Sequence, residues 1–560
     1  PNSKPAPVNR PSFTFIEHDD DLTSKRIKDV NARKAIRSHV MRDVRRRERL
    51  AGLKRTSKRD GRHPGASEAP YHAIDRSDER RLVLRASSST SSVETGSGDS
   101  STGSKSRRGR PVRWSAGYRL PFQTNPSPRS LPTSWFFDPF CALPGTSELP
   151  STVAHLVFYW KSVFVPMTFP NVDKITKAHT SIMELMVQSS FSDPGSFFGL
   201  MSMCAAHRAV LTALHTPGGA NRVLNDPDYC IMKAKSIREM NAKVRDPRRA
   251  LSNEAFDTII NLLTGSLIVG LFDEVRIHLT GLKRMVELRG GITDDSIRSS
   301  SMLSAIITAD VKAASGLMTK PVFPLTWDAQ PVPQEVQQRI RPPASSPLNK
   351  IGSGFFANTL LSPPLLRILN VLRDMVFFSI AYRTTPAVIH ATDPDFFRVL
   401  NCEAEHQLLS YVFTEDSGPK SISSGSELDL HPIEAVTRVA SICFLNDFLI
   451  VSPSSSGLGR ALTKHLKAAV SNCKLSFLVR LAKENFGLFV WALFIGAQGS
   501  LGHPERSWFV EQLGRVAMIC GWQSWEQVSE ILSDYFFVPS KANWRFIWDE
   551  AMTGFVISEV

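Results

Sequence analysis

The pattern that most constrains the fold is a pair of amphipathic stretches, residues 253–271 and 274–289. In the second stretch, four aliphatic residues recur at positions i, i+4, i+7 and i+11, which places them on one face of a helix. They are Val275, Leu279, Leu282 and Val286. Because such a face must pack on a neighbour, we expect two antiparallel helices, joined by a tight connection at Phe272 and Asp273.

Residues at the ends of this pair support the same interpretation. Ser252 and Asn253 are suited to cap the first helix, since a short polar side chain can accept from free backbone N–H groups there. Gly290 is suited to the left-handed position that follows the second helix. The pattern therefore predicts both helices together with their boundaries.

Helical patterns continue along most of the chain, whereas the alternation typical of strands is scarce. Further candidate helices are 151–164, 179–189, 197–214, 227–244, 364–382, 393–413, 432–450, 456–482, 485–497, 503–520, 525–537 and 543–551. The sequence thus predicts an all-α fold, an irregular array of antiparallel helix hairpins forming one large helical body. The proline-rich residues 319–350 are expected to make a long surface excursion.

We expect two regions along the chain. Residues 131–555 form the helical body, and residues 1–130 form a disordered, basic and Ser/Thr-rich N-terminal region. Within that region, a narrow apolar stripe predicts a short helix at 31–50 that folds on a partner. Residues 86–104 are low in complexity and offer little apolar surface to bury.

The positive charge of the chain is concentrated in the N-terminal region. The net charge is +14, and residues 25–63 hold sixteen Lys or Arg against four Asp or Glu. Residues 105–113 add five more positive charges, which leaves residues 114–560 close to neutral. This distribution predicts an anionic partner for the N-terminal segment rather than for the whole surface.

Two basic clusters are candidates for contact with nucleic acid or a nuclear import receptor. The first comprises Arg42, Arg45, Arg46, Arg47, Arg49, Lys54 and Arg55. The second comprises Arg108, Gly109, Arg110 and Pro111 and resembles an AT-hook, which lays an extended backbone in the minor groove and inserts arginines there. A nuclear-import signal and a solvated linker are the alternatives. Gly52 and the glycines at 61 and 65 break the helical pattern, so no leucine heptads follow the basic helix and the sequence argues against a basic zipper.

Catalytic and metal-binding motifs are absent from the sequence. It contains neither a phosphate-binding loop ending in Gly-Lys-Ser/Thr nor a GxSxG or HExxH motif. The seven cysteines form no CxxC pair, so we expect no zinc cluster and predict reduced, buried thiols in an intracellular protein. We therefore expect no enzyme activity and no cofactor.

Three remaining features have structural interpretations. His207 and His278 lie in apolar helical patterns and are expected at core or boundary positions. His503, Glu505 and Arg506, beside a helix start, are expected to serve capping and surface pairing. The longest apolar runs, such as 487–497, are too short to cross a bilayer, so no membrane association is expected.

Four segments in the same order together resemble the fungal-specific transcription factor domain proteins. They are Arg37 to Asp43 with its RxHVM pattern, the stretch from Pro139 and Phe140 to Tyr159 and Trp160, HLTGLKRMVELRGG at 278–291, and HPERSWFVEQL at 503–513. The resemblance extends from about residue 12 to residue 550. It implies an all-α regulatory body, a nuclear location and control of transcription.

The sequence departs from better-studied members of that family by lacking the six-cysteine binuclear zinc cluster. The partners that the resemblance and the charge imply are a nuclear import receptor, other transcription proteins, and DNA through the basic segment. The alternative is a co-regulator that binds proteins and no DNA.

Overall fold

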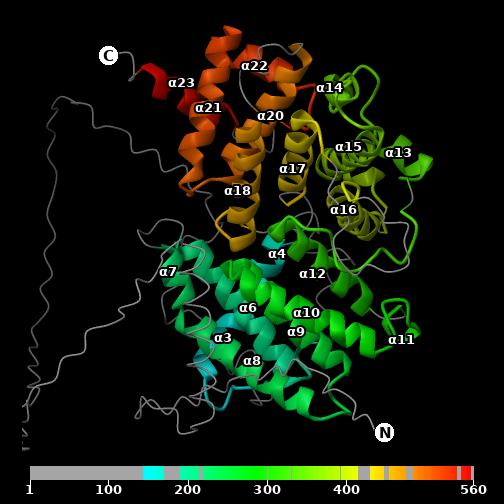
Figure 1. Cartoon of the computed structure of the whole chain (residues 1–560), viewed down its shortest axis with the longest axis vertical. Coiled ribbons are helices and arrows are strands. Elements are labelled where there is room, and N and C mark those ends of the chain that lie inside the picture. Colours follow the sequence, from blue (N-terminus) through cyan, green and yellow to red (C-terminus); the bar gives the residue numbers. More distant parts are fainter. Residues whose placement is uncertain are drawn as a thin grey trace, which may run out of the picture. The chain divides into compact units, whose positions relative to one another are not determined.

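The described part of the chain is entirely helical in its regular structure. The computed structural model describes residues 143–168, 190–213, 219–298, 301–329, 331–390, 392–413, 429–446, 453–473, 483–538 and 544–556. Within these ranges, helices follow one another and no β-strand occurs (Figure 1). The predicted all-α class is therefore confirmed, whereas the general arrangement as antiparallel hairpins stays a prediction.

The first half of the body holds long helices and short turns. They are α3 (Pro150–Tyr159), the π-helical turn η1 (Trp160–Phe164), α4 (Val165–Thr168), α6 (Pro194–Ala213), α7 (Gly219–Leu224), α8 (Pro227–Arg245), α9 (Asn253–Val269), α10 (Phe272–Leu288), α11 (Asp295–Arg298) and α12 (Ser301–Leu317).

The second half contains the helices α13 (Gln334–Ile340), α14 (Ser353–Phe356), α15 (Pro363–Thr384), α16 (Asp393–Ser410), α17 (Pro432–Asn446), α18 (Gly457–Asn472), α20 (Lys483–Gly499), α21 (Glu505–Cys520), α22 (Trp525–Leu532) and α23 (Trp544–Val556). The 3₁₀ turns η2 (Pro347–Lys350) and η3 (Pro386–Val388) lie between them.

The predicted pair of helices is present as α9 and α10, which pack against each other. Ser252 caps α9 by accepting from the Ala255 N–H, Gly290 is left-handed, and the predicted stripe on α10 is buried. The predicted connection was wrong, because Phe272 and Asp273 are the first residues of α10. The turn is made instead at Gly270, which ends α9 with a φ of +94°.

The buried apolar residues form two cores. The smaller one gathers residues of α3, η1, α6 and the start of α8, including Trp160, Phe197 and Met232. The larger one continues from α9 to α23 and contains the fully buried Trp491 of α20. Since α9 contributes to both cores, it joins them.

Helix α12 holds a central position in the larger core, although the sequence patterns did not predict it. It packs on α9, α10, α16 and α18. The helix consists mainly of small and aliphatic residues, and those on several of its faces are buried, such as Ile306, Ala309 and Ala313. A helix buried on several sides shows no single apolar stripe, which explains why periodicity failed to reveal it.

The proline-rich residues 319–350, here called the strap, differ from the predicted surface excursion. They include α13 and η2, and they bury Phe323, Val332 and Ile340 in the larger core. Asp310 of α12 accepts hydrogen bonds from the backbone N–H groups of Val322 and Phe323. The strap is therefore part of the packed body, because its apolar side chains fill space beside α12.

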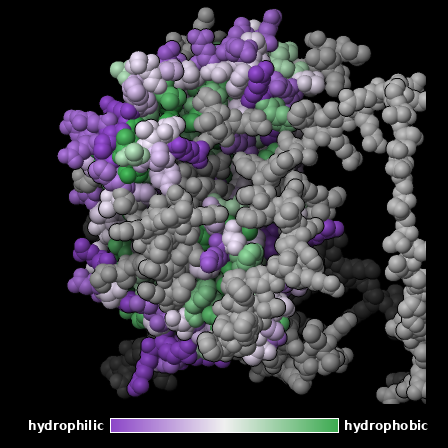
Figure 2. Space-filling model, turned by 180° about the vertical axis from the view of Figure 1, so that it is seen from behind, coloured by the Kyte–Doolittle hydropathy of each residue, from purple (hydrophilic) through white to green (hydrophobic). Residues whose placement is uncertain are grey.

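Exposed apolar residues are scattered over the surface between polar ones. Among the residues that carry colour in Figure 2, hydrophobic ones appear between hydrophilic ones. Among the cysteines, Cys204, Cys402 and Cys473 are buried as predicted, whereas Cys230 is exposed. The prediction of buried thiols therefore holds only in part.

Candidate functional sites

The residues predicted to contact nucleic acid or an import receptor all lie outside the described residues. They are Arg42, Arg45, Arg46, Arg47, Arg49, Lys54, Arg55, Arg108, Gly109, Arg110 and Pro111. The helix predicted at 31–50 and the boundary at 130/131 lie outside them as well. These assignments stay predictions.

The described body shows neither a metal cluster nor a membrane span. Among its described residues, no three His, Cys, Asp or Glu side chains come together as a metal site would require. None of the described helices is long and apolar enough to cross a bilayer.

A buried ion pair joins α12 to α16. Lys312 Nζ lies 2.7 Å from Glu405 Oε2, and Ser315 Oγ donates to Glu405 Oε1 at 2.6 Å. The side chains of Lys312 and Glu405 are 9% and 1% exposed. Because both charges are removed from water and paired with each other, the pair fixes how the two helices meet and offers no free acid or base.

A second buried ion pair holds the start of α6 against α8 and α9. Lys243 Nζ pairs with the Asp193 carboxylate and donates to Thr258 Oγ1 at 2.9 Å and to the Glu254 carbonyl at 3.2 Å. A Cβ at Gly195 would lie 2.7 Å from Lys243 Nζ and 2.9 Å from Thr258 Oγ1, so a larger residue there would displace the Lys243 ammonium from its partners. The polar groups of this cluster therefore bind one another and hold the three helices together.

Buried carboxylates hold the strap at several points. Trp327 Nε1 donates to Glu403, and Gln337 Nε2 donates to Asp374 Oδ2 at 3.0 Å. Arg339 forms two hydrogen bonds with Asp393, at 2.9 and 3.3 Å. Each acid therefore takes its partner from the strap, which ties the strap to α15 and α16.

Burial shifts the pKa of two acids that accept hydrogen bonds from the strap, Asp310 and Glu403. Burial raises the pKa of Asp310 to about 6, while the backbone hydrogen bonds from Phe323 and Val322 lower it. Burial likewise raises the pKa of Glu403, and the Trp327 hydrogen bond lowers it. The partners from the strap thus stabilise the charged forms of both acids.

The smaller core contains a tyrosine–histidine pair beside the π-helical turn. Tyr159 Oη and His207 Nδ1 are 2.8 Å apart, and Phe164 meets the imidazole edge-on. His207 is 2% exposed, and burial lowers its pKa to about 4. The prediction of a core histidine is confirmed, since the neutral ring is enclosed by aromatic side chains.

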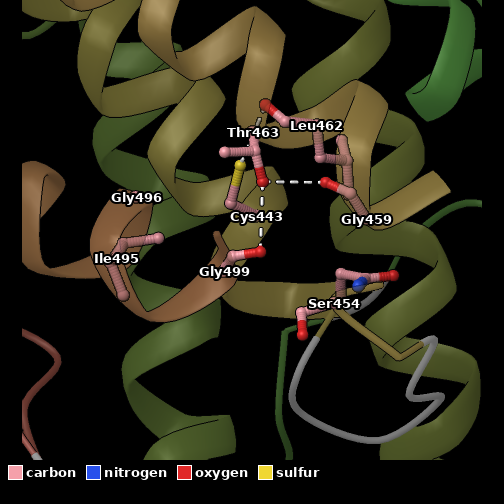
Figure 3. A pocket seen from close by; sticks show the side chains of 9 residues that line it. Cys443, Ser454, Gly459, Leu462, Thr463, Ile495, Gly496 and Gly499 are labelled. Carbon is pink, nitrogen blue, oxygen red and sulfur yellow. Dashed lines mark hydrogen bonds between the residues drawn. The ribbon is translucent and has the colours of Figure 1, made fainter. Parts of the chain in front are cut away.

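A pocket lies where α17, α18 and α20 meet (Figure 3). It is lined by Cys443, Asn446, Ser454, Gly459, Leu462, Thr463, Ile495, Gly496 and Gly499. Thr463 Oγ1 donates to the carbonyls of Gly459 and Gly499 at 2.8 and 3.2 Å, and Cys443 Sγ donates to the Leu462 carbonyl. These bonds join α18 to its neighbours around the pocket.

His503 lies in the turn that follows α20. It is 8% exposed, so the predicted surface role was wrong, and burial lowers its pKa to about 4. Arg506 pairs with Glu550 and donates to the Ala497 carbonyl at 2.7 Å. Of the three residues expected to serve capping and pairing, Arg506 therefore forms an ion pair.

A comparison with protein families identifies the body as a whole. The model of the fungal specific transcription factor domain matches residues 155–535. The chain belongs to this family. The match begins within α3 and ends just beyond α22, so it covers most of both cores of the fungal transcription factor domain but not α23. No curated protein and no solved structure matches the chain.

Sequence reasoning missed the pocket and the buried ion pairs of this fungal transcription factor domain. Lys312 and Glu405 are far apart in the sequence, and nothing in their local patterns indicates that they meet. The pocket is built from two glycines of α20 and one of α18. A glycine in a helical pattern is a weak signal that a packing or functional reason exists at that position.

Proposed function

We propose that this chain is a nuclear transcription regulator whose basic segment, residues 25–63, contacts nucleic-acid phosphates and an import receptor. The observation that supports it is the family match over residues 155–535. The family is one of transcription factors and not a class of enzymes. A nuclear location follows from that role.

The charge distribution supports the assignment of the contact to the N-terminal segment. Residues 25–63 carry a net charge of +12, whereas residues 114–560 are close to neutral. Clustered Lys and Arg attract phosphates without reading bases, and sequence specificity needs contacts to base edges. The segment therefore supplies affinity, with the Arg108–Pro111 motif or a partner protein contributing selectivity.

Salt dependence of DNA binding by the full chain tests this proposal. If Arg45, Arg46 and Arg47 each neutralise a phosphate, replacing all three with Ala should reduce the slope of log K against log salt by up to about 2.7. Fluorescence anisotropy with a labelled duplex between low and physiological salt measures this slope.

A matched control removes the same charge from the body. Arg276, Lys283 and Arg284 are exposed on α10. Replacing these three with Ala should leave the slope unchanged. Binding that does not depend on salt, or equal slopes for the two triple variants, would remove the DNA contact from the proposal.

The second candidate is a co-regulator that binds transcription proteins and no DNA. It is favoured by the absence of closely spaced cysteines, since the chain has no CxxC pair that could hold a zinc cluster. In that case, deleting residues 42–62 would exclude a tagged protein from the nucleus. Restoring import with a fused signal would then restore chromatin association fully.

A further inference from the structure

The strap carries a Ser-Pro pair in the stretch between α13 and α14, both of which pack on α15 (Figure 1). Ser346 comes immediately before η2 and lies between the exposed residues Ser345 and Pro347. Its backbone is extended, with φ −75° and ψ 133°, as is usual for a residue before proline. Its hydroxyl accepts from the Leu348 N–H at 3.3 Å and donates to no group of the described residues. This hydroxyl is therefore available for modification.

The other two Ser/Thr-Pro pairs in the described part of the chain differ from this one. The Ser362 hydroxyl donates to the Glu434 carboxylate, where a phosphate would meet a like charge. Thr385 has a ψ of 59°, so its backbone is not extended, and its hydroxyl lies 3.2 Å from that of Thr384. Of the three, Ser346 alone combines an extended backbone with a hydroxyl that donates to no other group.

Two arginines that form no salt bridge with a described acid lie beside the Ser-Pro turn. Arg373 of α15 donates to the Asn349 carbonyl at 2.6 Å. The Asn349 N–H donates to the Ser346 carbonyl at 3.1 Å, so the arginine and the serine bind the same asparagine. Burial lowers the pKa of Arg373, and the nearby charge of Arg341 lowers it further. The two guanidinium groups therefore repel each other next to Ser346.

An additional negative charge would be stabilised between these arginines. Asp374 acts on both of them, but it is 3% exposed and accepts from Gln337 Nε2 at 3.0 Å. Arg373 Nε is buried and makes no hydrogen bond. A buried donor without a partner costs about 1–3 kcal/mol, and a guanidinium forms strong charge-assisted hydrogen bonds with phosphate. A phosphate attached to the turn would supply both the missing acceptor and the missing charge.

We propose that Ser346 is phosphorylated by a proline-directed protein kinase and that Arg341 and Arg373 bind the resulting phosphate. The serine oxygen forms a bond to the γ-phosphorus of ATP, the bond from that phosphorus to the bridging oxygen breaks, and ADP leaves. The hydroxyl proton passes to the catalytic aspartate of the kinase. The product carries a charge of about −1.5 to −2 and ties the strap to α15 through Arg373.

Phosphate incorporation tests the modification itself. The full chain is incubated with ATP and a proline-directed kinase that phosphorylates a synthetic peptide of residues 341–352, and mass spectrometry quantifies phosphate at each serine and threonine. Ser346 should be modified about tenfold faster than Ser362, because a phosphate there faces no carboxylate partner. A full chain that stays unmodified at Ser346 while the peptide reacts would overturn the proposal. Equal rates at the two serines would overturn it too.

The ionisation of the phosphate tests its binding by the arginines. In ³¹P NMR of the phosphorylated full chain, the resonance that Ser346→Ala removes reports the second pKa of the phosphate, which nearby cations lower. Combining Arg341→Gln with Arg373→Gln should raise this pKa by about one unit. Glutamine keeps a donor for the Asn349 carbonyl, and Arg341→Gln alone, at an exposed position, should raise the pKa in part.

A matched control removes an exposed charge elsewhere on the same helix. Arg367→Gln lies on α15 and should leave the pKa of the phosphate unchanged. A pKa that is the same in the wild type and in the Arg341 and Arg373 variants would contradict binding of the phosphate by the arginines. An equal rise for Arg367→Gln would reduce the effect to net charge and contradict it as well. Either failure would leave the DNA contact proposed for residues 25–63 untouched.

Discussion

Gly457, the first residue of α18, lies directly against Gly270, which ends α9. A Cβ at Gly457 would lie 2.1 Å from the Gly270 Cα and 2.5 Å from the Leu267 carbonyl oxygen. One turn later, Arg460 donates to the Val269 carbonyl at 3.0 Å and closes the same contact. The two helices therefore meet backbone to backbone, and this contact attaches α18 to the helix shared by both cores.

Gly457→Ala should destabilise the protein by roughly 3 kcal/mol, because the backbones must separate to admit the methyl group. Urea unfolding followed by circular dichroism measures the change. Gly265→Ala, where the methyl has space, should be neutral or stabilising by about 0.5–1 kcal/mol. Equal effects of the two substitutions would show that the close approach of α9 and α18 is not present in solution.

The Lys312–Glu405 pair predicts strong non-additivity. Lys312→Met leaves the Glu405 carboxylate buried without its counter-charge and should cost about 3–5 kcal/mol. Adding Glu405→Gln removes that charge and keeps an acceptor for Ser315, so the double variant should recover part of the loss. Denaturant unfolding of the single and double variants completes the cycle. Simple additivity would refute a direct pairing.

The strap should loosen locally when its carboxylate contact is removed. Asp310→Ala leaves the buried N–H of Phe323 without an acceptor, which costs about 1–3 kcal/mol, and also releases the N–H of the more exposed Val322. Hydrogen exchange should therefore accelerate in residues 319–332, while exchange in α21 stays as in the wild type. Unchanged protection of the strap would mean that its apolar contacts alone hold it in place.

The buried histidine of the smaller core should make stability depend on pH. Because the pKa of His207 is about 4 in the folded protein and about 6.5 in the unfolded chain, the unfolded chain binds the proton more readily. The stability that neutral His207 contributes is present above pH 6.5 and is lost as the pH falls toward 4. When the pH is lowered from 7 to 4, the free energy of unfolding of His207→Gln should therefore rise by up to about 3 kcal/mol relative to that of the wild type.

The comparison with the variant is necessary because other groups titrate in the same range. Burial lowers the pKa of His278 and of His503 to about 4 as well, and raises the pKa of Asp257 and of Asp310 to about 6. These shifts act in opposite directions on stability. A stability difference between wild type and variant that is constant with pH would contradict the assignment to His207.

The sequence predicted those parts of the fold that depend on local periodicity. The stripe from Val275 to Val286 specified α10, and Ser252 fixed the start of α9. The sequence placed the connection two residues too late, at Phe272 and Asp273 instead of Gly270. Residues of these two types occur both in turns and in the first turn of a helix, so their identity did not decide between the two positions. Helix boundaries depend on backbone geometry that composition alone does not determine.

The parts that the sequence did not predict depend on contacts between distant segments. The partners of Asp310 lie in the strap, and those of Lys312 lie in α16. The pocket requires Gly459 and Gly499 to face each other across Thr463. Such juxtapositions follow from tertiary packing. The charge of residues 25–63, in contrast, was available from composition alone.

Chromatin mapping of the intact tagged protein, beside the Arg45, Arg46 and Arg47 triple alanine variant with a fused import signal, tests the central claim most directly. A nuclear regulator whose basic segment contacts DNA predicts enrichment at defined chromosomal sites, with markedly weaker enrichment for the variant at equal nuclear level. Equal enrichment for both proteins would contradict the DNA contact and favour the co-regulator. Absence of enrichment for the intact protein would contradict its assignment as a transcription regulator.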